Sequence, residues 1–117
     1  MRTATLQHFE AFQQIASELV ALAPKYAALG ENTLAITQHN VEAGNLDGAV
    51  AASVTAFDFM TTEYQRLTEG FQKATMDLLG ERPAAGENPM EFVIRILSMT
   101  AEQWGAMARK NGVALLF

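Results

Sequence analysis

Residues 46–79 read LDGAVAASVTAFDFMTTEYQRLTEGFQKATMDLL and contain no proline. Apolar residues recur every 3.5 positions throughout, which is the heptad spacing of a helix that packs along one stripe. With Val50 at position a, the a positions are Val50, Phe57, Tyr64, Phe71 and Leu78, and the d positions are Leu46, Ser53, Met60, Leu67 and Ala74. Such a helix is roughly 50 Å long. Its stripe must therefore be covered by other helices, by a second copy or by another apolar surface.

The positions that flank this stripe are mostly small and weakly polar. Position e holds Val54 and three threonines, and Phe59 adds an apolar side chain outside the stripe. A two-stranded coiled coil often carries Glu and Lys at its flanks to select a partner. The flanks here instead favour a bundle with a wide interface, or a helix that rests on an extended apolar surface.

The length and composition are those of a single domain that lacks cysteine and has no cluster of basic residues. The chain has 117 residues, is 50% hydrophobic and contains no cysteine, so disulfides and thiolate chemistry are excluded. Its net charge is -5, and nucleic-acid binding needs clustered Lys and Arg. We therefore expect no nucleic-acid partner. No signal peptide or transmembrane run is visible, so a cytoplasmic location is expected.

A second heptad pattern begins at Phe12 and predicts a helix over about residues 4–43. Its a positions include Leu19 and Tyr26. Pro24 removes a backbone donor inside this pattern and should kink or break the helix. Because the register is the same on both sides of Pro24, we favour one kinked helix, with two separate helices as the alternative.

The short connection at Gly44 and Asn45 should place this helix antiparallel to the helix at about 46–79, as in a helical hairpin. Residues 80–88 have the composition of a loop. Asn88 and Pro89 are a strong helix start signal, so a third, shorter helix is expected over about 89–111. The apolar tail at 113–117 should dock on a core or a partner.

No segment shows the alternation of a β-strand. The predicted fold is therefore all-α: a long antiparallel amphipathic hairpin plus a shorter third helix, in a coiled-coil-like bundle that forms one domain over 1–117.

Residues that carry catalytic or metal chemistry are sparse. His8 and His39 are the only histidines, and no Glu-x-x-His pair exists to build a metal site in a bundle. Acidic residues are scattered singly along the helices, and no phosphate-binding loop is present. We predict no enzyme activity, no cofactor and no metal site.

Two stretches resemble a known family. The run from Asn40 to Ser53, with Phe57-Asp-Phe-Met60 and Tyr64, is similar to the phasins, which coat polyhydroxyalkanoate storage granules in bacteria. The segment Asn88-Pro-Met-Glu-Phe-Val93, which opens a helix with Trp104 and Met107, resembles them more weakly. The chain has only three Lys and lacks an Ala/Lys-rich tail. The resemblance implies a cytoplasmic, non-enzymatic helical protein at the granule surface.

The leading hypothesis is accordingly a coat protein that lays an apolar stripe on the polyester and also self-associates. The alternative is an oligomeric helical interaction module, such as an adaptor or small chaperone; a small enzyme or ligand-binding bundle is a weaker third. The resemblance carries over no specific polymer-binding residue. The residues expected to form the surface-binding or oligomer face are Val50, Phe57, Phe59, Met60, Tyr64, Leu67, Phe71, Leu78, Phe12, Leu19, Tyr26 and Trp104.

Overall fold

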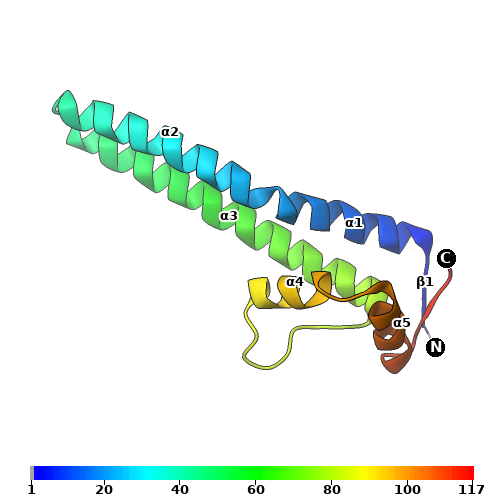
Figure 1. Cartoon of the computed structure of the whole chain (residues 1–117). Helices are drawn as coiled ribbons and strands as arrows, with labels where there is room; N and C mark the ends of the chain where they lie inside the picture. The colour runs from blue at the N-terminus through cyan, green and yellow to red at the C-terminus, as the bar shows by residue number, and fades with distance from the viewer. Residues whose placement is uncertain (1) are drawn as a thin grey trace. The chain divides into compact units, whose positions relative to one another are not determined.

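The computed structural model describes residues 2–117, and over these residues the chain is mostly helical, as predicted (Figure 1). The small sheet that it also contains was not predicted. In chain order the elements are β1 (Arg2–Ala4), α1 (Leu6–Val20), α2 (Leu22–Glu42), α3 (Leu46–Leu79), α4 (Pro89–Leu97), α5 (Ala101–Lys110) and β2 (Val113–Leu115).

The long helix α3 begins and ends where the sequence predicts. Asn45 caps it, since its side-chain oxygen accepts a hydrogen bond from the backbone N–H of Gly48 at 3.0 Å. Gly80 follows the last helical residue with a φ of 68°, a left-handed conformation that glycine adopts without steric cost.

The helix predicted over 4–43 is interrupted, but not at Pro24. The interruption lies at Ala21, between α1 and α2. Pro24 is then the third residue of α2, and the first N–H groups of a helix have no acceptor within the helix. The missing donor of Pro24 therefore costs α2 no internal hydrogen bond, which explains why the break precedes the proline.

The helix predicted over 89–111 is wrong as a continuous element, because it divides into α4 and α5. Thr100 starts the second helix with a reciprocal capping box: its hydroxyl accepts from Gln103 N–H at 3.2 Å, and Gln103 Oε1 accepts from Thr100 N–H at 2.8 Å. Asn88 caps α4 as predicted, accepting from Glu91 N–H at 2.8 Å.

The apolar tail forms a strand, which corrects the prediction that the chain has none. β2 pairs in parallel with β1, with Arg2 opposite Val113 and Ala4 opposite Leu115. Ala4 and Val113 are buried. Pairing satisfies backbone groups that the short segments could not satisfy alone.

Contacts divide the chain into two compact units, which we describe separately. The first, called the mixed unit, comprises residues 2–18 and 67–117. Its core centres on an aromatic cluster in which the ring of Phe71 lies 5.2 Å from Phe12 and 5.8 Å from Phe92, between centroids. Phe12 also meets Trp104 edge to face at 5.2 Å.

The second, called the two-helix unit, comprises residues 19–66 and contains α2 beside the first part of α3 (Figure 1). Tyr26 donates its hydroxyl to the carbonyl of Met60, and the hydroxyls of Thr37 and Ser53 lie 3.3 Å apart. The later residue of α2, Thr37, pairs with the earlier residue of α3, Ser53. The two helical segments therefore run in opposite directions. Ala49 is buried here, and small side chains allow the close approach.

Candidate apolar face

The structure separates the predicted face residues into buried, half-buried and exposed groups. The buried ones are Phe12, Leu19, Leu67, Phe71 and Leu78; the half-buried ones are Tyr26, Met60, Tyr64 and Trp104; the exposed ones are Val50, Phe57 and Phe59. They do not form one continuous surface.

Four of the buried residues, Phe12, Leu67, Phe71 and Leu78, belong to the core of the mixed unit. Phe71 is 0% exposed because the rings of Phe12 and Phe92 pack against it. Their expected role at an exposed face is therefore corrected: these side chains stabilise the fold. A charge at position 71 would disrupt the core instead of testing an exposed face.

Six of the nine large apolar residues that are exposed in the two-helix unit fall on one stripe of α3 and one stripe of α2; the other three are Val20, Ile36 and Phe59. On α3, Leu46, Val50 and Val54 are spaced four residues apart and Phe57 follows three later, which aligns them along one stripe. On α2, Leu34 lines the same groove as Phe57, and Val41 lies seven residues further on. We call these six residues the charge-free face, because none of the six carries a charge; Glu31, Asp47 and Asp58 border them.

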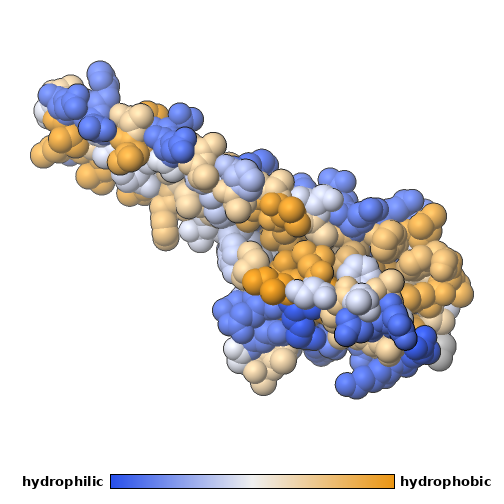
Figure 2. Space-filling model, in the orientation of Figure 1, coloured by the Kyte–Doolittle hydropathy of each residue, from blue (hydrophilic) through white to orange (hydrophobic). Residues whose placement is uncertain are grey.

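The charge-free face is strongly exposed. Phe57 is 68% exposed, Leu34 67% and Leu46 65%, and the other three are each at least half exposed. Figure 2 shows orange surface beside hydrophilic blue residues along this unit. Contiguous apolar patches beyond about 300–600 Å² are unusual on monomeric proteins and mark interaction surfaces.

A shallow groove of about 320 Å³ runs along this face between α2 and α3. Its lining combines small, apolar and hydroxyl side chains: Gly30, Ser53, Ala56, Leu34, Phe57, Met60, Thr33 and Thr37. The hydroxyl of Ser53 donates to the carbonyl of Ala49 at 3.1 Å. The groove therefore offers mainly apolar contact, and the one hydroxyl proton of Ser53 is already donated within the protein.

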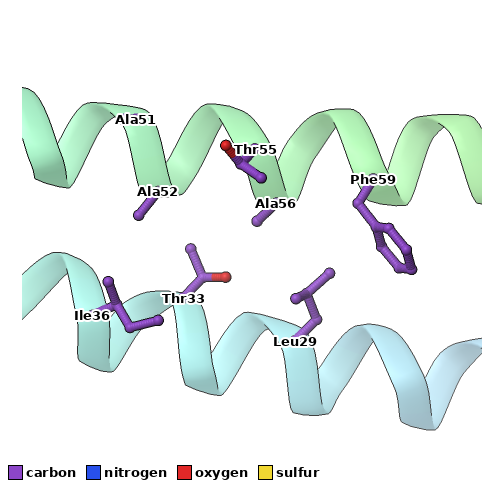
Figure 3. A pocket seen from close by; sticks show the side chains of 8 residues that line it. All are labelled: Leu29, Thr33, Ile36, Ala51, Ala52, Thr55, Ala56 and Phe59. Carbon is purple, nitrogen blue, oxygen red and sulfur yellow. The ribbon is translucent and has the colours of Figure 1, made fainter.

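A second groove, of about 460 Å³, lies on the other side of the same helix pair. Phe59 lines this groove and is 54% exposed. Because Phe59 follows Phe57 by two residues, its side chain points about 200° away from that of Phe57 around the helix axis. Figure 3 shows Leu29, Thr33 and Ile36 of α2 pointing toward α3 across this groove.

Charged groups sit near the 63–66 end of the two-helix unit. Arg66 pairs with Glu63 at 2.7 Å, and this hydrogen bond lowers the pKa of the Glu63 carboxyl. Burial and the neighbouring Glu63 charge raise the pKa of Tyr26. Tyr26 therefore stays a neutral hydrogen-bond donor to Met60, which joins α2 to α3 at this end.

Sequence reasoning missed four residues of the charge-free face: Leu34, Val41, Leu46 and Val54. Leu46 was assigned to the stripe but not to the face. The available signal was the absence of charge at positions 46, 50, 54 and 57, read together with the seven-residue spacing of Leu34 and Val41. Leu46, Val50 and Phe57 stand at positions a and d, but Val54 stands at position e, and a heptad assignment that considers only a and d omits it.

No protein-family model, curated protein or solved structure matches the chain. Among residues 2–117, no group of three or more His, Asp or Glu side chains is arranged to hold a metal ion. None of the helices described is long and apolar enough to cross a membrane.

Proposed function

We propose that this is a non-enzymatic amphipathic protein that covers a hydrophobic polyester surface through its charge-free face. The observation that carries the proposal is the exposure of that face: six apolar side chains on two adjacent helices are each at least 50% exposed. Removing that area from water is favourable by about 25 cal/mol per Å².

The polyester in question is polyhydroxyalkanoate, and the location is the granule surface in the cytoplasm. The resemblance of residues 40–64 to phasins supports this choice, and these residues overlap the charge-free face. Acidic residues border the face, among them Glu31, Asp47 and Asp58. In a coat they point to water, where like-charge repulsion keeps coated particles apart.

The proposal also includes a long antiparallel helical hairpin within a coiled-coil-like bundle. The contacts Tyr26–Met60 and Thr37–Ser53 support antiparallel pairing within the two-helix unit. Pairing of two long helices exposes a flat double strip, and a flat strip suits an extended surface better than a single helix does.

Cosedimentation with polyhydroxybutyrate particles tests the proposal, with polystyrene beads as the control for generic adhesion. We expect saturable binding to the polyester that exceeds binding to polystyrene. Equal binding to both materials, or none to the polyester, would contradict a polyester coat.

A matched pair of variants tests the face itself. Phe57→Gln removes an aromatic ring from the charge-free face, whereas Phe59→Gln removes one from the other side of the same helix. Because Phe57 is 68% exposed, we expect its loss to weaken binding roughly five- to thirtyfold. Phe59→Gln should bind like the unmodified protein. Circular dichroism of both variants should show unchanged helicity.

The second candidate is an oligomeric helical interaction module. The groove beside Phe59 favours it, since a coat on a surface uses one side of the two-helix unit and leaves this groove open. Self-association through that side would also fit the homo-oligomer expected from the sequence. Sedimentation velocity separates the two: a stable oligomer that Phe59→Gln dissociates, without polyester binding, would support the module.

A further inference from the structure

The mixed unit contains an apolar cavity of about 350 Å³. Leu78 and Leu79 of α3 lie at its wall and are at most 1% exposed. Leu115 of β2 and Ala101, the first residue of α5, also line it. With Phe9 of α1, the cavity is thus built from four elements of one unit, and it shares no lining residue with the charge-free face.

Aromatic rings line the rest of the cavity. Phe117 stacks on Phe9 with 5.4 Å between ring centroids and is 56% exposed, so the cavity reaches solvent beside this pair. Trp104 completes the lining. A cavity of about 150 Å³ lined by Leu, Ile and Phe holds a benzene molecule, and this one is larger.

No lining side chain has a hydrogen-bonding group left for a ligand. The only polar atom among the lining side chains is the indole Nε1 of Trp104, which already donates to the carbonyl of Ile96 at 2.9 Å. A polar group placed in such a cavity would lose its hydrogen bonds to water without replacement. The lining therefore suits hydrocarbon and not a polar group.

We propose that this cavity binds the alkyl chain of an amphiphile, with the polar head left in water beside Phe9 and Phe117. A linear alkyl chain fills a cavity that is larger than a single benzene ring requires. Phe117 is half exposed, so the head group would reach water beside it. This site does not rest on the polyester proposal, because none of the residues of the charge-free face lines it.

Trp104 is the only tryptophan of the chain, so its fluorescence reports this cavity alone. The probe is decanoate that carries a bromine at its terminal carbon, titrated into the full-length protein below the micelle concentration. Bromine quenches an indole that it touches. We expect saturable quenching, which unbrominated decanoate does not cause but relieves by competition.

Two variants on α5 make the test specific. Ala101→Leu places a larger side chain at the cavity, whereas Ala106→Leu makes the same change at an exposed alanine that does not line it. We expect Ala101→Leu to weaken binding about tenfold or more and Ala106→Leu to leave it unchanged. Both alanines are exposed, so both variants should fold, which circular dichroism checks.

Quenching that appears only with micelles, that does not saturate, or that is the same in both variants would overturn the assignment. The Phe57→Gln protein provides a further arm, because it should bind brominated decanoate normally. Failure of the polyester assay with normal quenching would refute the coat alone, and the reverse result would refute the alkyl site alone.

Discussion

Phe57 and Phe71 offer the sharpest test of the structure, because the sequence assigns both to position a of one heptad pattern. The structure separates them: Phe71 is 0% exposed in the mixed unit, and Phe57 is 68% exposed in the two-helix unit. Truncating each to alanine should therefore have very different effects on the free energy of unfolding, although the sequence pattern treats the two as equivalent.

The expected magnitudes follow from burial. Phe71→Ala removes a fully buried ring and leaves a cavity between Phe12 and Phe92, which costs about 3–5 kcal/mol. Phe57 keeps only about a third of its side chain from water, so Phe57→Ala should cost about 0.5–1 kcal/mol of the 1.5–3 kcal/mol for full burial.

Urea unfolding followed by circular dichroism measures both costs. At a slope of about 2 kcal/mol per M, the midpoint should fall by about 1.5–2.5 M for Phe71→Ala and by about 0.5 M or less for Phe57→Ala. A cost for Phe57→Ala equal to that of Phe71→Ala would refute the reasoning. It would mean that position 57 is covered in solution, and a dependence of the midpoint on protein concentration would then identify a second copy.

Three further predictions concern the mixed unit. Thr100→Ala removes the cap that Gln103 completes, and thermal unfolding should show a loss of about 0.5–2 kcal/mol. Gly80→Ala should cost more than about 1 kcal/mol in urea unfolding, because φ is 68° and the new Cβ would lie 2.8 Å from a side chain carbon; a neutral result would contradict the turn. Arg95 donates a hydrogen bond to Glu87 at 2.8 Å, which lowers the pKa of the Glu87 carboxyl in the folded protein. The ion pair therefore stabilises the fold fully above the pKa that Glu87 has in the unfolded chain, and this stabilisation is lost as the pH falls through the lower pKa of the folded state. The melting temperature of Arg95→Gln should consequently fall less than that of the unmodified protein on acidification below about pH 5, and equal slopes would argue against the ion pair.

The fold was predictable where its signals are local. The limits of α3 and the Asn88 cap follow from residues next to them in the sequence. The start of α5 is equally local, since Thr100 and Gln103 have the spacing of a capping box, but the continuous apolar face of 92–107 concealed it. The pairing of β1 with β2 joins residues more than a hundred positions apart, and neither three-residue strand carries a pattern that marks it alone.

The division of the α3 stripe was not predictable from its spacing. Periodicity shows which side of a helix is apolar, but it does not show what covers that side. The same heptad phase continues through Phe57 and Phe71, and only the packing of α1 and α4 around the second distinguishes them. The candidate face therefore required the structure, together with the observation that positions 46, 50, 54 and 57 are all apolar.

Helix lengths explain why some of the stripe remains exposed. α3 has 34 residues and is roughly 50 Å long, whereas α4 and α5 have 9 and 10 residues and reach roughly 14 and 15 Å. Even end to end these two helices could not cover α3, and α2, which runs beside its first part, leaves Val50, Val54 and Phe57 more than half exposed. A polar residue at position 57 would leave the core of the mixed unit intact, since Phe57 takes no part in it. An exposed apolar strip that the fold does not need is therefore best explained by a surface that covers it. In the proposed function, the polyester is that surface.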